Sequence, residues 1–348
     1  MEHECGILGV CDAYCNNYII PNLNKLQHRG YQSAGLSYVT DNGIQTFKKL
    51  GLVDDVFADF QYHSTVKLCI AHVRYSTRKK TSEDCMLQEA QPIIGQVNKT
   101  FALAHNGNIP VIDSIKKEYN IETTNNSDSY ILTKLIELLY KKYNNIEDTL
   151  KYIVNKIAGS YSLLILYDNC IYAIRDRFGI RPLLIGKSSS GYCFVSESVA
   201  LGQYEYFRDV NPGEIVKCEN NKLATRYQAN NINPMFCSFE YIYFMDSESE
   251  INSMNISDWR YKLGYELGKS EQDDNIPDQA IVLSVPNSSI YGAKGFADAI
   301  NKPYKEYICK HDNVNRTFII AHEEERKIMC ENKFYLQSDK LINQDVYL

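Results

Sequence analysis

A cysteine close to the start of the chain has the surroundings that nucleophilic catalysis requires. Four residues, 1–4, precede Cys5, and Gly6 opens a short apolar run that ends at Val10. If the Glu4–Cys5 bond is cleaved, Cys5 gains a free α-amino group beside its thiol, and both groups titrate near pH ~8 to 8.5. The amine can then act as the base for its own thiol. On these residues alone, a buried structural cysteine is the simpler interpretation.

Four further polar clusters lie where predicted strands or helices begin or end, and they are too polar for a core: residues 26–30, 72–77, 105–108 and 127–129. Arg74 presents a planar guanidinium that suits a carboxylate. The side-chain amide of Asn106 and the backbone N–H of Gly107 supply the two donors that an oxyanion requires. Asp128, at the start of a predicted helix, can hold a substrate ammonium group.

Each cluster also has a structural interpretation when it is taken alone. Asn106 and Gly107 form a pair that is common in tight turns. Arg74 can pair with a surface carboxylate, and Asp128 can cap its helix. Together with the thiol, however, the clusters provide a nucleophile, an oxyanion hole, a carboxylate clamp and an ammonium clamp. This set predicts hydrolysis of glutamine through a thioester.

The elements that must position these residues follow from the hydrophobic pattern. After the first apolar run, strands are predicted at 34–39, 44–48, 66–73, 101–105, 162–167, 171–175, 183–185 and 192–196. Helices are predicted at 17–27, 127–143 and 146–157, with Ser127 as the cap of the second. The order of strands, a helix pair and further strands predicts antiparallel sheets layered with helices.

The character of the sequence changes near residue 235. An aromatic stretch at 239–244 precedes the polar linker 246–253, and then a helix is predicted at 259–268, a strand at 280–285 and a helix at 293–300. This alternation of helix and strand predicts the beginning of a parallel α/β sheet.

Composition excludes several classes of protein. The chain of 348 residues has a formal net charge of −6, which gives no electrostatic footprint for nucleic acid. The N-terminus shows no signal peptide, and no apolar run approaches the ~18 residues of a membrane span. The 11 cysteines are scattered without zinc-site spacing, as is typical of reduced thiols in a cytoplasmic protein.

Five motifs in this order resemble the class-II glutamine amidotransferases, which are N-terminal nucleophile hydrolases: residues 5–9, 26–30, 72–75, 104–108 and 127–129. Further motifs extend the resemblance to the amidophosphoribosyltransferase family of de novo purine synthesis: residues 175–183, 196–198, 212–214, 239–244, 285–286 and 316–319. The resemblance implies an α+β fold, with a four-layer αββα sandwich followed by an incomplete α/β phosphoribosyltransferase-like domain. It also implies three parts: a propeptide at 1–4, a glutaminase domain at 5–235 and the truncated domain at 236–348.

For glutamine hydrolysis the resemblance implies a role for each polar cluster and no cofactor. Cys5 is the nucleophile once the propeptide is removed, and Asn106 with the Gly107 amide holds the oxyanion. Arg29 supports the site from its loop.

The same resemblance assigns the glutamine clamps. Arg74 binds the α-carboxylate of glutamine, with Thr77 nearby. Asp128 binds the α-ammonium group. Tyr130 departs from the family pattern, because a glutamate normally follows the Ser-Asp-Ser motif.

The second half departs further from the family. Asn287 stands where an acidic residue is usual, and the chain stops three residues after Asp345, before the loop that binds phosphoribosyl pyrophosphate. We therefore expect phosphoribosyl transfer to be lost or supplied by another chain, with phosphoribosyl pyrophosphate bound only in the presence of that partner. The family's Mg²⁺ belongs to this half, and its site is not present here. We also expect a homo-oligomer or a complex with a full-length enzyme.

A second interpretation of the same departures is a catalytically silent homologue that regulates the full-length enzyme. The mass of the N-terminus separates the two interpretations, because retention of residues 1–4 blocks the amine of Cys5.

Overall fold

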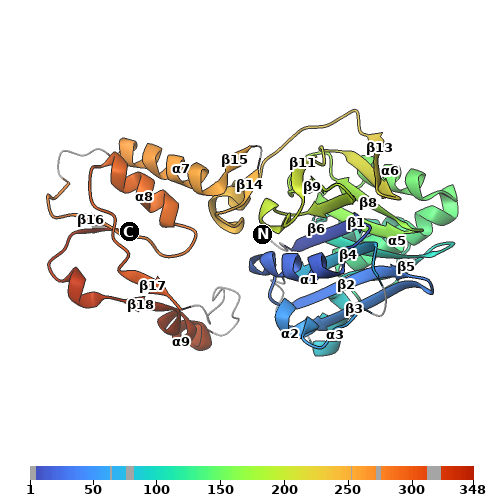
Figure 1. The fold of residues 1–348 in the computed structure, drawn as a ribbon, viewed down its shortest axis with the longest axis horizontal. Coiled ribbons are helices and arrows are strands. Elements are labelled where there is room, and N and C mark those ends of the chain that lie inside the picture. The colour runs from blue at the N-terminus through green and yellow to red at the C-terminus, as the bar shows by residue number, and fades with distance from the viewer. Residues whose placement is uncertain (1–4, 63–64, 76–81, 252, 272–275, 312–322) are drawn as a thin grey trace. The chain divides into compact units, whose positions relative to one another are not determined.

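The structure, a computed structural model, describes residues 5–62, 65–75, 82–251, 253–271, 276–311 and 323–348. It divides into two compact units, Met1–Cys237 and Ser238–Leu348 (Figure 1). The predicted propeptide 1–4, the predicted glutamine ligand Thr77 and the motif 316–319 lie outside the described residues.

The first unit is built on two antiparallel sheets. Their strands in chain order are β1 (Gly6–Asp12), β2 (Ser33–Thr40), β3 (Gly43–Leu50), β4 (Leu68–Arg74), β5 (Ile93–Gln96), β6 (Thr100–Asn108), β7 (Ser160–Tyr167), β8 (Cys170–Arg175), β9 (Leu184–Lys187), β10 (Gly191–Val195), β11 (Glu205–Asp209), β12 (Glu214–Glu219) and β13 (Lys222–Gln228). One sheet has the order β11-β9-β10-β1-β4-β2-β3, and the other has the order β13-β12-β8-β7-β6-β5. The predicted strands are present in these sheets.

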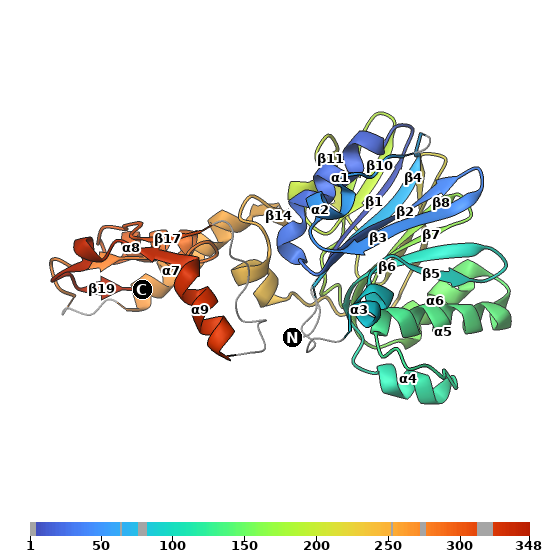
Figure 2. The ribbon, with the colours of Figure 1, turned by 90° about the horizontal axis from the view of Figure 1, so that it is seen from below.

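Helices cover the outer face of each sheet (Figure 2). The helical elements of this unit are α1 (Asn16–Lys25), η1 (Gln27–Arg29), α2 (Val53–Phe57), α3 (Glu83–Glu89), α4 (Ile112–Glu118), α5 (Asp128–Tyr143), α6 (Ile146–Lys156) and η2 (Ser198–Ala200). One apolar cluster joins α1 and α2 to the seven-stranded sheet, a second joins α4, α5 and α6 to the six-stranded sheet, and a third fills the space between the sheets. The predicted α+β class with an αββα sandwich is therefore confirmed.

Strand β1 lies in the middle of the seven-stranded sheet, between β10 and β4. All seven of its residues are buried. Leu8 and Val10 belong to the core under the helices, whereas Ile7 and Cys11 belong to the core between the sheets. This alternation is the period of two that an extended strand imposes.

Some local predictions differ from the structure. The predicted helix 17–27 ends at Lys25 and is followed by the 3₁₀ turn η1. Ser127 occupies the N-cap position of α5, but its side chain makes no capping hydrogen bond. The predicted strand 280–285 is reduced to the two residues of β16, because the chain after it turns toward a helix.

The second unit contains a helix pair and short strands. Its elements are η3 (Glu240–Phe244), β14 (Glu250–Ile251), β15 (Met254–Asn255), α7 (Ile256–Ser270), β16 (Ile281–Val282), α8 (Ile290–Ala299), β17 (Ile308–Lys310), α9 (Glu323–Lys333), β18 (Phe334–Leu336), η5 (Ser338–Leu341) and β19 (Val346–Tyr347). Strands β16 and β19 pair in parallel, as the alternation of helix and strand predicts. In the part of the chain that the structure describes, no helix is long and apolar enough to cross a membrane.

Glycines let helices α7 and α8 pack backbone to backbone. A Cβ atom added to Gly264 would lie 1.9 Å from the carbonyl oxygen of Gly292, and one added to Gly295 would lie 2.0 Å from the carbonyl oxygen of Tyr261. A Cβ atom added to Gly292 would meet only the Arg260 carbonyl oxygen, at 3.6 Å. The two glycines of the Gly264–Gly292 contact therefore differ in how much space a methyl group would find.

This difference gives a matched pair of variants for the second unit. We expect Gly264→Ala to lower the free energy of unfolding by roughly 1–3 kcal/mol, because the added methyl group forces the helices apart. Gly292→Ala should be neutral or stabilise by up to about 1 kcal/mol, because alanine is the better helix former. Urea unfolding followed by the fluorescence of Trp259, the single tryptophan of the chain and a residue of α7, measures both effects. Equal effects of the two substitutions would contradict the packing.

Candidate active site

Backbone contacts hold Cys5 in a buried position at the entry to β1. The Cys5 side chain and backbone are 3% exposed. The backbone nitrogen of Cys5 donates a hydrogen bond to Asn106 Oδ1 at 3.2 Å, and the Cys5 carbonyl oxygen accepts one from Arg29 Nε at 2.9 Å. The thiol is directed to the carbonyl oxygen of Tyr75 at 4.0 Å. Three predicted site residues are therefore in direct contact.

A buried ion pair fixes Arg29 in turn. Arg29 lies in η1 and Glu197 lies just before η2, and both side chains are 0% exposed. The Arg29 guanidinium donates to the Glu197 carboxylate, which also contacts His28 Nε2 at 2.8 Å. Burial by itself would raise the pKa of Glu197, but His28 and Arg29 together hold it well below its usual value. The carboxylate therefore stays ionised and keeps Arg29 directed at Cys5.

Asn106 and Gly107 lie inside strand β6, so the tight-turn interpretation is wrong. They pair with Ser162 and Tyr161 of β7. Asn106 is 0% exposed, and its Nδ2 atom has no hydrogen-bond partner among the described residues. Because Asn106 Oδ1 already accepts from Cys5, the amide group is oriented and its Nδ2 donor is available for a ligand oxygen.

Gly107 is at a position that accepts no side chain. Its φ angle is +152°, and an added Cβ atom would lie 2.0 Å from the Ser160 carbonyl oxygen. Only glycine fits at this position, because β6 and β7 approach each other closely here.

Arg74, at the end of β4, is held by partners that the sequence did not reveal. The Arg74 guanidinium is 4% exposed and donates to the Glu89 carboxylate, to the Glu89 carbonyl oxygen at 3.2 Å and to Gln32 Oε1 at 3.0 Å. Glu89 is itself buried, so the expected surface carboxylate is a buried one. A guanidinium carries five N–H donors, more than these three contacts use.

Asp128 is the first residue of α5, and Ser127 occupies the N-cap position before it. Its Oδ1 atom accepts from the Ser129 backbone nitrogen at 2.8 Å, and its Oδ2 atom accepts from the Ile109 nitrogen at 3.3 Å. The positive end of a 16-residue helix also favours a carboxylate at this position. The carboxylate is thus fixed at the end of the helix.

The surroundings of Cys5 shift the pKa of its thiol in both directions. Burial, as the largest effect, raises the pKa of Cys5 above its usual value. The hydrogen bond to the Tyr75 carbonyl and the positive charges of Arg74 and Arg29 act in the opposite direction, whereas Asp128 adds to the rise. The thiol therefore remains protonated near neutral pH and requires a base to react.

Two supporting residues, Glu197 and Glu89, pair with site residues that no local sequence pattern connects to them. Glu197 is 168 positions from Arg29, and Glu89 is 15 positions from Arg74. Glutamates at such spacings look like ordinary surface residues in a sequence. Glu197 does belong to one of the quoted motifs, at 196–198, but its role became clear only from the contact with Arg29.

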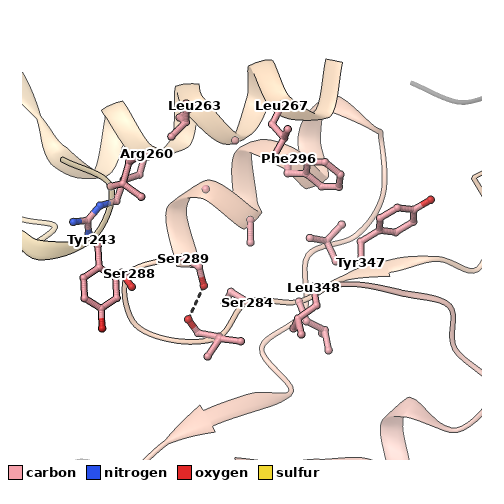
Figure 3. A pocket seen from close by; sticks show the side chains of 17 residues that line it. Tyr243, Arg260, Leu263, Leu267, Ser284, Ser288, Ser289, Phe296, Tyr347 and Leu348 are labelled. Carbon is pink, nitrogen blue, oxygen red and sulfur yellow. Dashed lines mark hydrogen bonds between the residues drawn. The ribbon is translucent and has the colours of Figure 1, made fainter. Parts of the chain in front are cut away.

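A separate pocket of about 630 Å³ lies in the second unit (Figure 3). Its walls are largely apolar and include Leu263 and Leu267 of α7, Phe296 of α8 and Tyr347 of β19. The described lining contains no Asp or Glu side chain. Its one charged side chain, Arg260, donates to the carbonyl oxygens of Tyr241 and Met245. This lining does not fit Mg²⁺, which prefers carboxylate and phosphate oxygens.

Comparisons with known proteins find similar sequences that are glutamine amidotransferases. A family model described as a glutamine amidotransferase domain matches residues 77–203. The amidophosphoribosyltransferase of Methanothermobacter thermautotrophicus is 32% identical over 344 residues, which cover 96% of this chain and 71% of that protein. The human amidophosphoribosyltransferase is 30% identical over 393 residues, which cover 100% of this chain and 74% of that protein.

A solved structure is also similar to most of this chain. The glutamine phosphoribosylpyrophosphate amidotransferase from Bacillus subtilis, complexed with ADP and GMP, superposes with a TM-score of 0.82 at 29% identity. The match covers 96% of this chain and 72% of that chain.

The Arg29–Glu197 pair gives a prediction about stability. Glu197→Gln leaves the Arg29 charge buried without its counter-ion, so we expect a loss of roughly 3–5 kcal/mol at neutral pH. Because the pKa of Glu197 is depressed in the folded state, its contribution is fully present above the unfolded pKa of about 4.3 and is lost as the pH falls below it. Urea unfolding followed by circular dichroism at pH 7, 4 and 2.5 should show the difference between the two proteins shrinking as the pH falls below about 4.3.

Glu219→Gln is the matched control for this variant. Glu219 pairs with Lys217 at 3.1 Å, but its side chain is 46% exposed, so we expect a change below about 1 kcal/mol. A difference between wild type and Glu197→Gln that did not vary with pH would contradict the assigned ionisation.

Proposed function

The chain belongs to the amidophosphoribosyltransferase family, the glutamine-dependent amidotransferases of purine synthesis, and we propose that its first unit hydrolyses glutamine to glutamate and ammonia through a thioester on Cys5. The observation that carries the proposal is the contact between the Cys5 backbone nitrogen and Asn106 Oδ1. This one hydrogen bond joins the nucleophile to the donor group that would stabilise the transition state.

The reaction begins with a proton transfer within Cys5. After removal of residues 1–4, the α-amine takes the thiol proton, and Sγ attacks the side-chain carbonyl carbon of glutamine. The tetrahedral oxyanion accepts a hydrogen bond from Asn106 Nδ2 and from the backbone N–H of Gly107. The α-ammonium returns its proton to the leaving nitrogen, and ammonia departs. Water then attacks the thioester, and glutamate and the free thiol are released.

The other residues orient the substrate. Arg74 binds the α-carboxylate and Asp128 the α-ammonium, and the family resemblance assigns Thr77, which lies outside the described residues, to the carboxylate as well. Arg29 holds the Cys5 carbonyl and thereby fixes the direction of the thiol. The site needs no metal for this step, because the backbone and side-chain donors carry the developing charge.

For the second unit we propose that phosphoribosyl transfer requires another chain. The apolar lining of its pocket, without an acidic side chain among the described residues, supports this view. Ammonia from the first unit then passes to the partner or is released. A complex with a full-length relative would supply the acidic groups that the described lining lacks.

Replacement of Cys5 tests the nucleophile. We expect the mature wild-type protein to begin at Cys5 by intact mass and to release glutamate from glutamine. Cys5→Ala should abolish this release, a loss of at least about 10³-fold, because no other group forms the thioester. Cys69→Ala is the control, since Cys69 is an equally buried thiol that lies outside the site on β4. Retention of Met1 and no glutamate release would indicate the silent regulatory homologue instead.

Two substitutions at Asn106 separate its two contacts. Asn106→Asp keeps an acceptor for the Cys5 nitrogen but removes the Nδ2 donor, whereas Asn106→Ala removes both. We expect kcat to fall by roughly 10²–10³-fold in both variants, with a smaller change in KM, because an oxyanion donor acts on the transition state. Near-normal turnover of Asn106→Asp would show that Asn106 only anchors Cys5. Asn155→Ala, at an amide on α6 remote from the site, is the control.

A further inference from the structure

One short segment, residues 89–92, contacts one proposed glutamine clamp, Arg74, and the residue next to the other, Asp128. Glu89 pairs with Arg74, which would hold the α-carboxylate. Gln91, two positions later, contacts Ser129, the neighbour of Asp128. The segment runs from the last residue of α3 to the residue before β5 and belongs to neither clamp itself.

Gln91 uses both ends of its amide inside the protein. It is 4% exposed. Its Oε1 atom accepts from the His105 backbone nitrogen at 2.7 Å, and its Nε2 atom donates to Ser129 Oγ at 3.0 Å. The amide therefore bridges strand β6, one residue before Asn106, and the first turn of α5.

The Ser129 hydroxyl completes a chain of hydrogen bonds that ends on Asp128. Ser129 Oγ lies 2.9 Å from His105 Nδ1 and donates to Asp128 Oδ1 at 3.3 Å. A hydroxyl has one proton and two acceptor positions. All three contacts are satisfied when the hydroxyl donates to Asp128 and accepts from Gln91 and from the Nδ1–H of His105. The Ser129 backbone nitrogen donates to the same carboxylate oxygen, at 2.8 Å.

Strands β2 and β3 of the other sheet fix the segment from the opposite side. Lys48 Nζ donates to the carbonyl oxygens on both sides of Gln91, those of Ala90 and Pro92. Gly35 lies so close that an added Cβ atom would be 2.3 Å from the Gln91 carbonyl oxygen. The backbone of Gln91 therefore has little freedom to move.

We propose that Gln91 and Ser129 are positioning residues that hold the Asp128 carboxylate for the α-ammonium of the substrate and so set the preference of the site for an α-amino acid. This inference rests on the proposed glutaminase function and extends it to the origin of its selectivity. The side-chain polar atoms of both residues contact one another, His105 and Asp128, so we assign neither a direct bond to the substrate. Their effect is therefore exerted on binding through Asp128.

The test compares ligands with and without an α-amino group. L-glutamate and glutarate, which differ only by that group, are used as competitive inhibitors of glutamine hydrolysis by the full chain. In Ser129→Ala we expect inhibition by L-glutamate to weaken roughly tenfold to a hundredfold, as loss of a hydrogen bond to a charged group predicts. Inhibition by glutarate should change less than about threefold. The KM for glutamine should rise by about the same factor as the inhibition constant of L-glutamate. The kcat should fall much less.

Further variants separate positioning from a general structural role. Gln91→Glu keeps the acceptor for the His105 nitrogen but loses the donor to Ser129, so it should reproduce the loss of selectivity even if Ser129→Ala folds poorly. Ser129→Thr retains the hydroxyl and should restore the selectivity. Ser37→Ala is the control. It removes a buried hydroxyl on β2 that lies 2.8 Å from Thr46 Oγ1, and it should leave the ratio of the two inhibition constants unchanged.

The possible outcomes distinguish this inference from the function on which it rests. If the wild-type chain turns over no glutamine, the proposed function fails and the inference fails with it. If the chain hydrolyses glutamine but Ser129→Ala and Gln91→Glu weaken both inhibitors equally, or neither inhibitor, the inference alone is overturned.

Discussion

The site depends on a buried ion pair that no solvent screens. Arg29 and Glu197 are both fully buried, so the charge of each is stabilised by the other, and His28 adds to the stabilisation of the Glu197 carboxylate. The pair joins the turn after α1 to the turn after β10, and its guanidinium also holds the Cys5 carbonyl oxygen. The position of the nucleophile is therefore a consequence of how distant parts of the sheet close on one another. A chain that did not complete this sheet would have no site.

The sequence was sufficient for much of the first unit, because its signals are local. Apolar runs predicted the strands, and helical spacing predicted α5 and α6. The polar clusters at the ends of these elements identified Cys5, Arg74 and Asp128 as candidate site residues. What the sequence could not show is pairing over long distances. Glu197 and Glu89 have the residue type of surface groups, and only the folded chain brings them into the interior. Asn106 and Gly107 were ambiguous for a related reason: the same dipeptide makes a turn or, as here, a strand position where the neighbouring backbone leaves no room for a side chain.

The second unit was less predictable from its sequence. Its strands are two or three residues long, so the alternation that identifies a strand has no room to appear. Its clearest structural feature is instead the contact between α7 and α8, where glycines allow the two backbones to approach. In a sequence such glycines indicate breaks rather than helix contacts. The apolar pocket beside this contact likewise combines α7, α8 and β19, which are widely separated along the chain.

The central position of β1 has a consequence for how the length of this region can vary. Side chains alternate between two different cores along β1, so inserting or deleting a single residue there would exchange their faces throughout the strand. Only an insertion or deletion of an even number of residues would keep the side chains of β1 on their faces. Each such change would move the Cys5 sulfur several ångströms away from Asn106. Length variation is accommodated far more easily at surface connections such as the turn at 41–42, whose residues are exposed to solvent.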